Sequence, residues 1–214
     1  MSPTLTAADA VAFADCIEAG GVAVFPADTV YGLACDPDDA RAVARLYELK
    51  GRAPHKPAAV MWFDGERALA ALPELGEGTR AVVERLMPGA VTLLLPNPHG
   101  RFPLAAGPGG DVRTLGVRVP RLTGTATALV RVRHAVLQSS ANEAGGADAR
   151  TLDAVPAAIR DGADLALDAG PLPGTPSTVV DLRDYDDTGE WAIVREGAVP
   201  TEDVARALGI VGRP

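Results

Sequence analysis

The sequence has few aromatic residues and few cysteines. Aromatic side chains make up 4% of its 214 residues, although hydrophobic residues as a whole make up 47%. A core must therefore be built mainly from Ala, Val and Leu. The length suits one ordinary domain, which we place over residues 1–214. The two cysteines, Cys16 and Cys35, are too few for a disulfide framework or a zinc site.

Long apolar runs and a basic N-terminal leader are also missing. No stretch approaches the roughly 18 to 20 apolar residues that a membrane span requires, and no basic segment precedes an apolar one at the N-terminus. We therefore expect a cytoplasmic protein without a membrane partner. The net charge of -8 argues against broad, non-specific nucleic-acid binding, because such binding needs Lys and Arg to neutralise phosphates. It does not exclude a local basic pocket.

Segments with strand character alternate with segments of helical spacing. Apolar strands are predicted at 22–26, 58–63, 91–95, 115–119, 135–139, 165–167, 177–182 and 191–194. Helices are predicted at 7–19, 38–50, 69–72, 79–87, 124–132, 152–160 and 201–208. This alternation indicates an α/β protein with a twisted, open, mixed sheet and flanking helices. The strand order is left open.

Polar clusters lie at the ends of the predicted elements, where open α/β sheets bind ligands. The loop 50–57 carries Lys50, Arg52 and Lys56 between a helix and a strand. Such cations can complement the helix dipole, or they can hold an anion such as phosphate. The loop 139–146 combines small hydroxyls, Asn142 and glycines, which permit close approach to a ligand. Both interpretations of each loop stay open on pattern alone.

Arg118 stands inside an apolar strand, where an unpaired charge would be costly. Its partner is either a protein carboxylate or a ligand anion. Signals for other chemistry are missing. The three histidines lack metal-ligand spacing, no Gly-rich phosphate loop or dinucleotide fingerprint occurs, and Ser139 and Ser140 do not form a nucleophile elbow.

Taken in order, six motifs resemble the YrdC-like family of L-threonylcarbamoyl-adenylate synthases. They are PADTVYGL at 26–33, KGR at 50–52, VRVP at 117–120, SAN at 140–142, PSTVVD at 176–181 and REG at 195–197. Each motif alone is a weak signal, whereas six in the same order over residues 20–200 are a strong one. The resemblance implies a YrdC-like sheet with a concave, basic cavity, in the short form of the family.

The resemblance also implies a nucleotidyltransferase reaction. ATP, accompanied by Mg²⁺, would react with bicarbonate and L-threonine to give L-threonylcarbamoyl-adenylate, which a downstream tRNA threonylcarbamoyl transferase would use. No side chain is expected to act as nucleophile or base, or to bind the metal. By position, the ATP contacts would be Lys50, Arg52, Lys56, Thr114, Ser140, Asn142 and Arg195. The threonine contacts would be Thr29, Arg118 and Ser177, and the amino-acid carboxylate, with no permanent protein carboxylate, would be the partner of Arg118.

Three departures from the family pattern affect the substrate end more than the Lys50–Arg52 end. Ala27 replaces a Thr, Met61 stands where many members carry a His that contacts threonine, and Asp148 replaces a Ser where nucleotide contact is expected. One alternative is therefore a paralogue with another carbamoyl acceptor, as in hydrogenase maturation or antibiotic tailoring. Another is a double-stranded RNA or tRNA-binding module that uses the basic concave face. The net charge of -8 disfavours this module, so a weak RNA contact is the most that we expect.

Overall fold

The computed structural model describes residues 3–53 and 55–209, and nine strands of that part form one sheet. The sheet order is β7-β1-β2-β6-β3-β5-β4-β8-β9. The pairs β1–β7, β3–β5 and β4–β8 are parallel and the other neighbours are antiparallel, so the predicted open, mixed sheet is confirmed. The strands are β1 Ala23–Pro26, β2 Tyr31–Cys35, β3 Ala59–Met61, β4 Val91–Pro96, β5 Thr114–Arg118, β6 Val136–Ser140, β7 Leu165–Ala166, β8 Thr178–Asp181 and β9 Ala192–Arg195.

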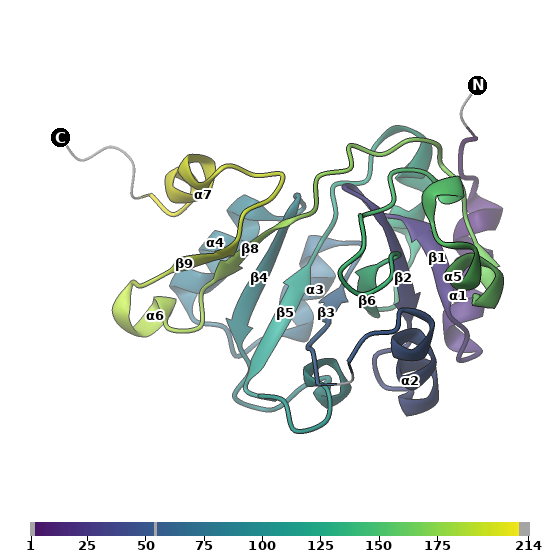
Figure 1. Cartoon of the computed structure of the whole chain (residues 1–214). Coiled ribbons are helices and arrows are strands. Elements are labelled where there is room, and N and C mark those ends of the chain that lie inside the picture. Colours follow the sequence, from purple (N-terminus) through teal and green to yellow (C-terminus); the bar gives the residue numbers. More distant parts are fainter. Residues whose placement is uncertain (1–2, 54, 210–214) are drawn as a thin grey trace.

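Helices flank the sheet at both ends (Figure 1). The α-helices are α1 Ala7–Glu18, α2 Ala40–Leu49, α3 Gly65–Ala71, α4 Glu77–Leu86, α5 Ala157–Gly162, α6 Tyr185–Thr188 and α7 Thr201–Ala207. The helix predicted at 124–132 is a 3-10 helix, η2 Gly124–Arg131, and η1 Pro103–Ala106 and η3 Leu152–Ala154 are also 3-10 helices. Within the described residues, no helix has both the length and the apolarity needed to cross a bilayer.

The two faces of the sheet are covered differently. A large apolar cluster packs one face against α2, α3, α4, α5 and α7. A smaller cluster packs the other face against α1 and η2, but only over the end of the sheet near β1. Phe13 of α1 lies against the rings of Phe25 and Phe63, with centroids 5.3 and 5.7 Å away. The rest of this second face, over β5, β4 and β8, is not covered by any helix of the described residues and forms a cavity floor.

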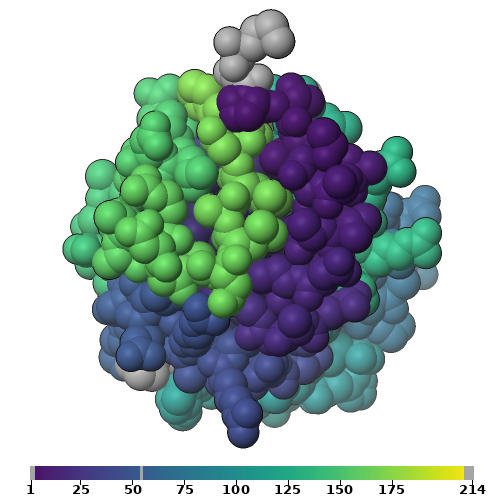
Figure 2. All heavy atoms as spheres, turned by 90° about the vertical axis from the view of Figure 1, so that its right-hand side faces the viewer, coloured from purple at the N-terminus to yellow at the C-terminus, as the bar shows by residue number. Residues whose placement is uncertain are grey.

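Residues 168–176 connect β7, at one edge of the sheet, to β8 near the other edge. The buried hydroxyl of Tyr31 donates towards the Asp168 carboxylate and the Gly170 carbonyl, both 2.9 Å away. Further along, the Gly174 N–H donates to the Thr29 carbonyl at 2.8 Å. Figure 2 shows the light green chain around this segment lying beside the purple N-terminal part. The connection therefore carries the chain directly to Ser177 at the cavity.

Candidate functional site

A cavity of about 600 Å³ lies on the uncovered part of the sheet. Seven of the ten contact residues predicted from the sequence line it: Thr29, Arg52, Thr114, Arg118, Ser140, Ser177 and Arg195. Lys50, Lys56 and Asn142 are not among its lining residues. The structure thus brings together most of the predicted set from six separate segments of the chain.

The cavity floor follows from the alternation of side chains along each strand. In β5, the first, third and fifth residues line the cavity: Thr114, Gly116 and Arg118. The two residues between them, Leu115 and Val117, belong to the large apolar cluster, although Leu115 also contributes to the cavity lining. In β4, Thr92 and Leu94 likewise line the cavity. The same strands therefore build the core with one face and the site with the other.

The charged groups of the lining are four arginines and three aspartates: Arg52, Arg118, Arg183, Arg195, Asp111, Asp148 and Asp181. Arg183 is held by Asp181, whose carboxylate accepts from its Nε at 2.9 Å. The Nε atoms of Arg52 and Arg118 are instead buried without a hydrogen-bond partner in the described part of the chain. Because arginines exceed aspartates by only one, the basic character of the cavity stays a prediction. Its unpartnered donors do suit anionic ligands.

Lys50 lies beneath the cavity and not on its wall. Its Nζ donates to the Ser140 carbonyl at 2.7 Å, to the Asn142 carbonyl at 2.9 Å and to the Asn142 side-chain oxygen at 2.5 Å. Burial and the nearby Arg52 lower the pKa of Lys50 to about 8, while Asp148 opposes this shift. An ammonium group has three protons, so these contacts use all of them. Lys50 therefore shapes the loop that presents Ser140.

The other predicted contact residues of the loops 50–57 and 139–146 differ in their solvent exposure. Asn142 is buried, and its amide nitrogen donates to the Gly146 carbonyl at 2.6 Å, which fixes the loop turn. Arg52 donates from Nη2 to the Pro57 carbonyl at 2.6 Å and lies over the Tyr47 ring. Lys56 is exposed. Pro54, in the same loop, lies outside the described residues. Arg52 is thus the cation of this loop that reaches the cavity wall.

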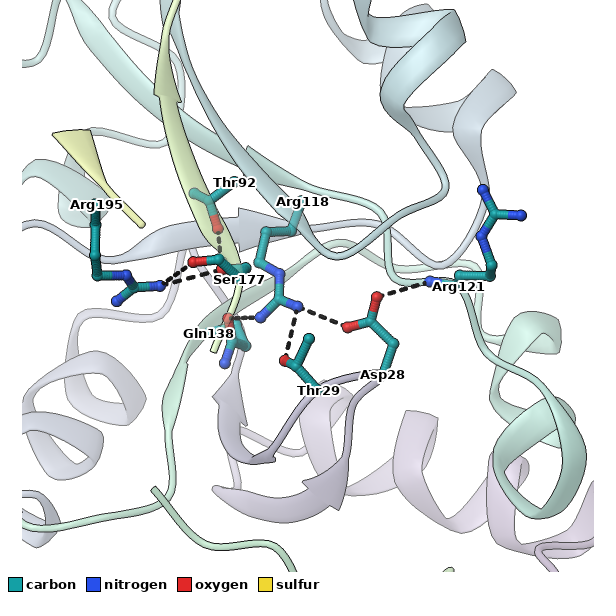
Figure 3. A network of polar contacts seen from close by, with 8 residues as sticks. All are labelled: Asp28, Thr29, Thr92, Arg118, Arg121, Gln138, Ser177 and Arg195. Carbon is teal, nitrogen blue, oxygen red and sulfur yellow. Dashed lines mark hydrogen bonds and ion pairs between the residues drawn. The ribbon is translucent and has the colours of Figure 1, made fainter. Parts of the chain in front are cut away.

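Arg118 has a permanent carboxylate partner. Its Nη2 donates to Oδ1 of Asp28 at 2.7 Å, and both side chains are about 95% buried (Figure 3). Desolvation and the charge of Arg195 lower the pKa of Arg118, whereas Asp28 raises it. The expectation that only a substrate carboxylate would satisfy Arg118 is therefore wrong for the ligand-free protein. Asp28 lies within the PADTVYGL motif, but no feature of the sequence linked it to Arg118.

A second polar chain joins Arg195 to the cavity floor (Figure 3). The Arg195 Nη2 donates to the Ser177 carbonyl at 2.7 Å, and the Ser177 hydroxyl lies 2.8 Å from the Thr92 hydroxyl. Gln138, on β6, contacts Arg118 only at 3.5 Å. Sequence reasoning missed Thr92 and Gln138, although each is a polar residue inside an apolar strand. That signal, which singled out Arg118, would have found both.

The three departures from the family pattern lie in different surroundings. Ala27 and Met61 are buried in the apolar cluster under α1, and neither lines the cavity. Asp148 does line it. Thr114 also does so, but its hydroxyl donates to Asp111 at 2.7 Å. Asp148 is therefore the departure placed to meet a ligand directly.

Met61→His should destabilise the protein and not improve its substrate contacts. Met61 is fully buried among apolar side chains, so an imidazole there would lose hydration without gaining a partner, at a cost of about 2 kcal/mol. Thermal unfolding should show a melting temperature lower by roughly 4 to 8 °C, while Met61→Leu should change it little. An unchanged melting temperature with tighter amino-acid binding would contradict this placement.

The fold and the cavity define an α/β protein whose sheet presents a hollow lined by four arginines and three aspartates. A family model described as telomere recombination, for the Sua5, YciO and YrdC proteins, matches residues 15–197. The chain therefore belongs to the Sua5/YciO/YrdC family, as its motifs predicted. Among the described residues, no group of three or more His, Cys, Asp or Glu side chains is placed to hold a metal ion.

Named relatives agree with this assignment. The threonylcarbamoyl-AMP synthase of Chromobacterium violaceum is 34% identical over 170 residues, which are 77% of this chain and 83% of that protein. The P. abyssi Sua5 structure with L-threonine matches at a TM-score of 0.80 and 26% identity over 96% of this chain. This chain spans only 58% of that Sua5 chain. E. coli YciO, at 24% identity and a TM-score of 0.76, shares the fold over 94% of this chain and 95% of its own.

Proposed function

We propose that the chain is a cytoplasmic L-threonylcarbamoyl-adenylate synthase, a nucleotidyltransferase that serves tRNA threonylcarbamoyladenosine formation. Its substrates would be ATP, bicarbonate and L-threonine, and its products L-threonylcarbamoyl-adenylate, pyrophosphate and water. A downstream tRNA threonylcarbamoyl transferase would receive the adenylate. The names of similar proteins support this assignment, including a synthase that is 34% identical and a Sua5 structure that holds L-threonine.

One observation of the site carries the proposal. Two arginines that line one cavity, Arg52 and Arg118, each have a buried Nε without a partner among the residues that the structure describes. An unmet buried donor is costly, and an anionic ligand removes that cost. Arg52 lies in the loop that follows α2, whereas Arg118 is the last residue of β5. The two cations therefore reach the cavity from different elements. This separation suits a phosphate at Arg52 and an amino-acid carboxylate at Arg118.

The chemistry then needs positioning more than a protein nucleophile. The threonine nitrogen forms a bond to the bicarbonate carbon, and water leaves. An oxygen of the resulting carbamate attacks the α-phosphorus of ATP, and the bond to the β-phosphate breaks to release pyrophosphate. The chain would hold the two anions close together and stabilise the developing charge with Arg52 and Arg195. Mg²⁺ would enter as part of the MgATP substrate, bound mainly by phosphate oxygens and water.

The test is pyrophosphate release by the pure protein with ATP, Mg²⁺ and bicarbonate. L-threonine should stimulate release strongly, and omission of bicarbonate should abolish it. Serine, glycine and a reaction without amino acid are run in parallel. Equal release without any amino acid, or with carbamoyl phosphate alone, would favour a carbamoyl-adenylate-forming paralogue and would remove threonine from the proposal.

A further inference from the structure

Asp28 connects two parts of the sheet that are not neighbours. It lies in the turn between β1 and β2, whereas Arg118 ends β5, and β6 and β3 lie between these strands. One carboxylate oxygen accepts from Arg118 Nη2 at 2.7 Å, and the other accepts from the main-chain N–H of Arg121 at 3.1 Å. Figure 3 shows Asp28 between these two partners. Its carboxylate therefore fixes both the Arg118 side chain and the backbone that follows β5.

Asp28 binds only one nitrogen of the Arg118 guanidinium, so the other nitrogens can contact a ligand. Nη1 contacts Gln138 only at 3.5 Å, and the Thr29 hydroxyl lies 3.4 Å from Nη2. Within residues 3–53 and 55–209, Nε has no hydrogen-bond partner. The distances to Gln138 and Thr29 are at the limit of hydrogen bonding. Burial lowers the pKa of Arg118, and the charge of Arg195, a second cation that lines the cavity, adds to this shift. Asp28 thus offsets one of two neighbouring positive charges while it holds one nitrogen of Arg118.

We propose that Asp28 is a positioning residue for the amino-acid substrate. It holds Nη2 of Arg118 and so fixes the orientation in which Nη1 meets a carboxylate in the cavity. Its charge also keeps the Asp28–Arg118 pair nearly neutral, which disfavours simple anions that bind by charge alone. This inference rests on the proposed function, because the carboxylate is taken to be that of the acceptor amino acid.

Two roles of Asp28 predict opposite results for Asp28→Asn, which keeps the shape and removes the charge. A positioning role predicts a KM for L-threonine raised about tenfold, the effect of one lost charge-assisted contact. The KM for ATP should change little, and inhibition by sulfate should become stronger. A carboxylate that merely competes with the substrate for Arg118 would give a lower KM for L-threonine. That lower value, or an unchanged one, would overturn the inference.

Asp164→Asn is a control at a carboxylate with the same kinds of partner but a more exposed side chain. Asp164 also accepts from an arginine, Arg45, at 2.5 Å and from a main-chain N–H, that of Val22, at 2.8 Å. It is not among the residues that line the cavity. The control should lose the same kinds of contact and keep the KM for L-threonine. An equal rise of KM in both variants would assign the effect to general loosening of the fold and would contradict a positioning role.

A measurement on the wild-type protein covers the case in which Asp28→Asn does not fold. The Nε–H of Arg118 is buried, has no partner in the described part of the chain and belongs to the same guanidinium as Nη1. Its ¹⁵N-arginine resonance should therefore shift when L-threonine is added without ATP. No shift, despite threonine binding by calorimetry, would overturn the inference. A wild-type protein that binds L-threonine but releases no pyrophosphate would contradict the proposed function and leave the Asp28 result interpretable.

Discussion

Lys50→Met is expected to lower the melting temperature by roughly 10 °C and to remove most ATP binding, although Lys50 does not line the cavity. The substitution leaves at least two buried acceptors of the loop 140–142 without a donor. Each unmet buried acceptor costs about 1 to 3 kcal/mol, and a protein of this size loses about 2 to 4 °C per kcal/mol. The loop that presents Ser140 should then lose its shape. Calorimetry and thermal unfolding measure the two effects.

Lys56→Met provides the control in the same loop. Lys56 is exposed, so the melting temperature of this variant should equal that of the wild type. Its ATP affinity tests separately whether Lys56 contacts phosphate, as its position in the family pattern predicts. A Lys50→Met protein with the wild-type melting temperature but weak ATP binding would contradict the structural role and would support Lys50 as a direct phosphate ligand.

Arg118→Met is expected to reduce kcat/KM for L-threonine by about 100-fold and also to destabilise the ligand-free protein. The activity loss reflects one or two charge-assisted hydrogen bonds to the substrate carboxylate. The stability loss, about 3 to 5 kcal/mol, arises because Asp28 stays buried without its partner. Pyrophosphate assays and denaturant unfolding measure the two quantities independently.

The double variant Arg118→Met with Asp28→Asn separates these effects. Because no buried charge is left unpaired, much of the lost stability should return. The activity should not return, because the cation is still missing. Recovery of activity together with stability would show that Arg118 acts only as a structural ion-pair partner, and it would remove the carboxylate contact from the proposed mechanism.

The sequence predicted the fold class because its apolar periodicity is local information. Eight of the nine described strands coincide with predicted apolar runs. The exception is β2 at Tyr31–Cys35, which follows the polar Asp28-Thr29 pair and contains Gly32, and these residue types favour a turn over a strand. Gly32 instead lies within the strand, where an added Cβ would meet Phe25 and Gln138 at 3.0 Å. The single unit over 1–214 stays a prediction.

The sequence predicted which residues share the cavity better than it predicted their hydrogen-bond partners. Family order placed Arg52, Arg118 and Arg195 together, and they do share a cavity. The sequence placed Lys50 among the phosphate ligands because it stands next to Arg52 in the same motif. The position of a lysine in a motif does not reveal which acceptors its ammonium group contacts. Its acceptors are 90 and 92 residues further along the chain. The Asp28–Arg118 pair also spans 90 residues. Such partners depend on sheet order, which periodicity does not encode.

The non-local construction of the cavity has a consequence for folding. Thr29 comes from the first β-hairpin and Arg195 from β9, the last strand in chain order of the described part. Contacts between residues so far apart in sequence are expected to form late in folding. Closing a long loop costs conformational entropy before the contact can stabilise the fold. A ribosome must therefore release nearly the whole family domain before any ligand can be held. Nucleotide and amino acid can then act only on the finished fold, as stabilisers that slow its reopening.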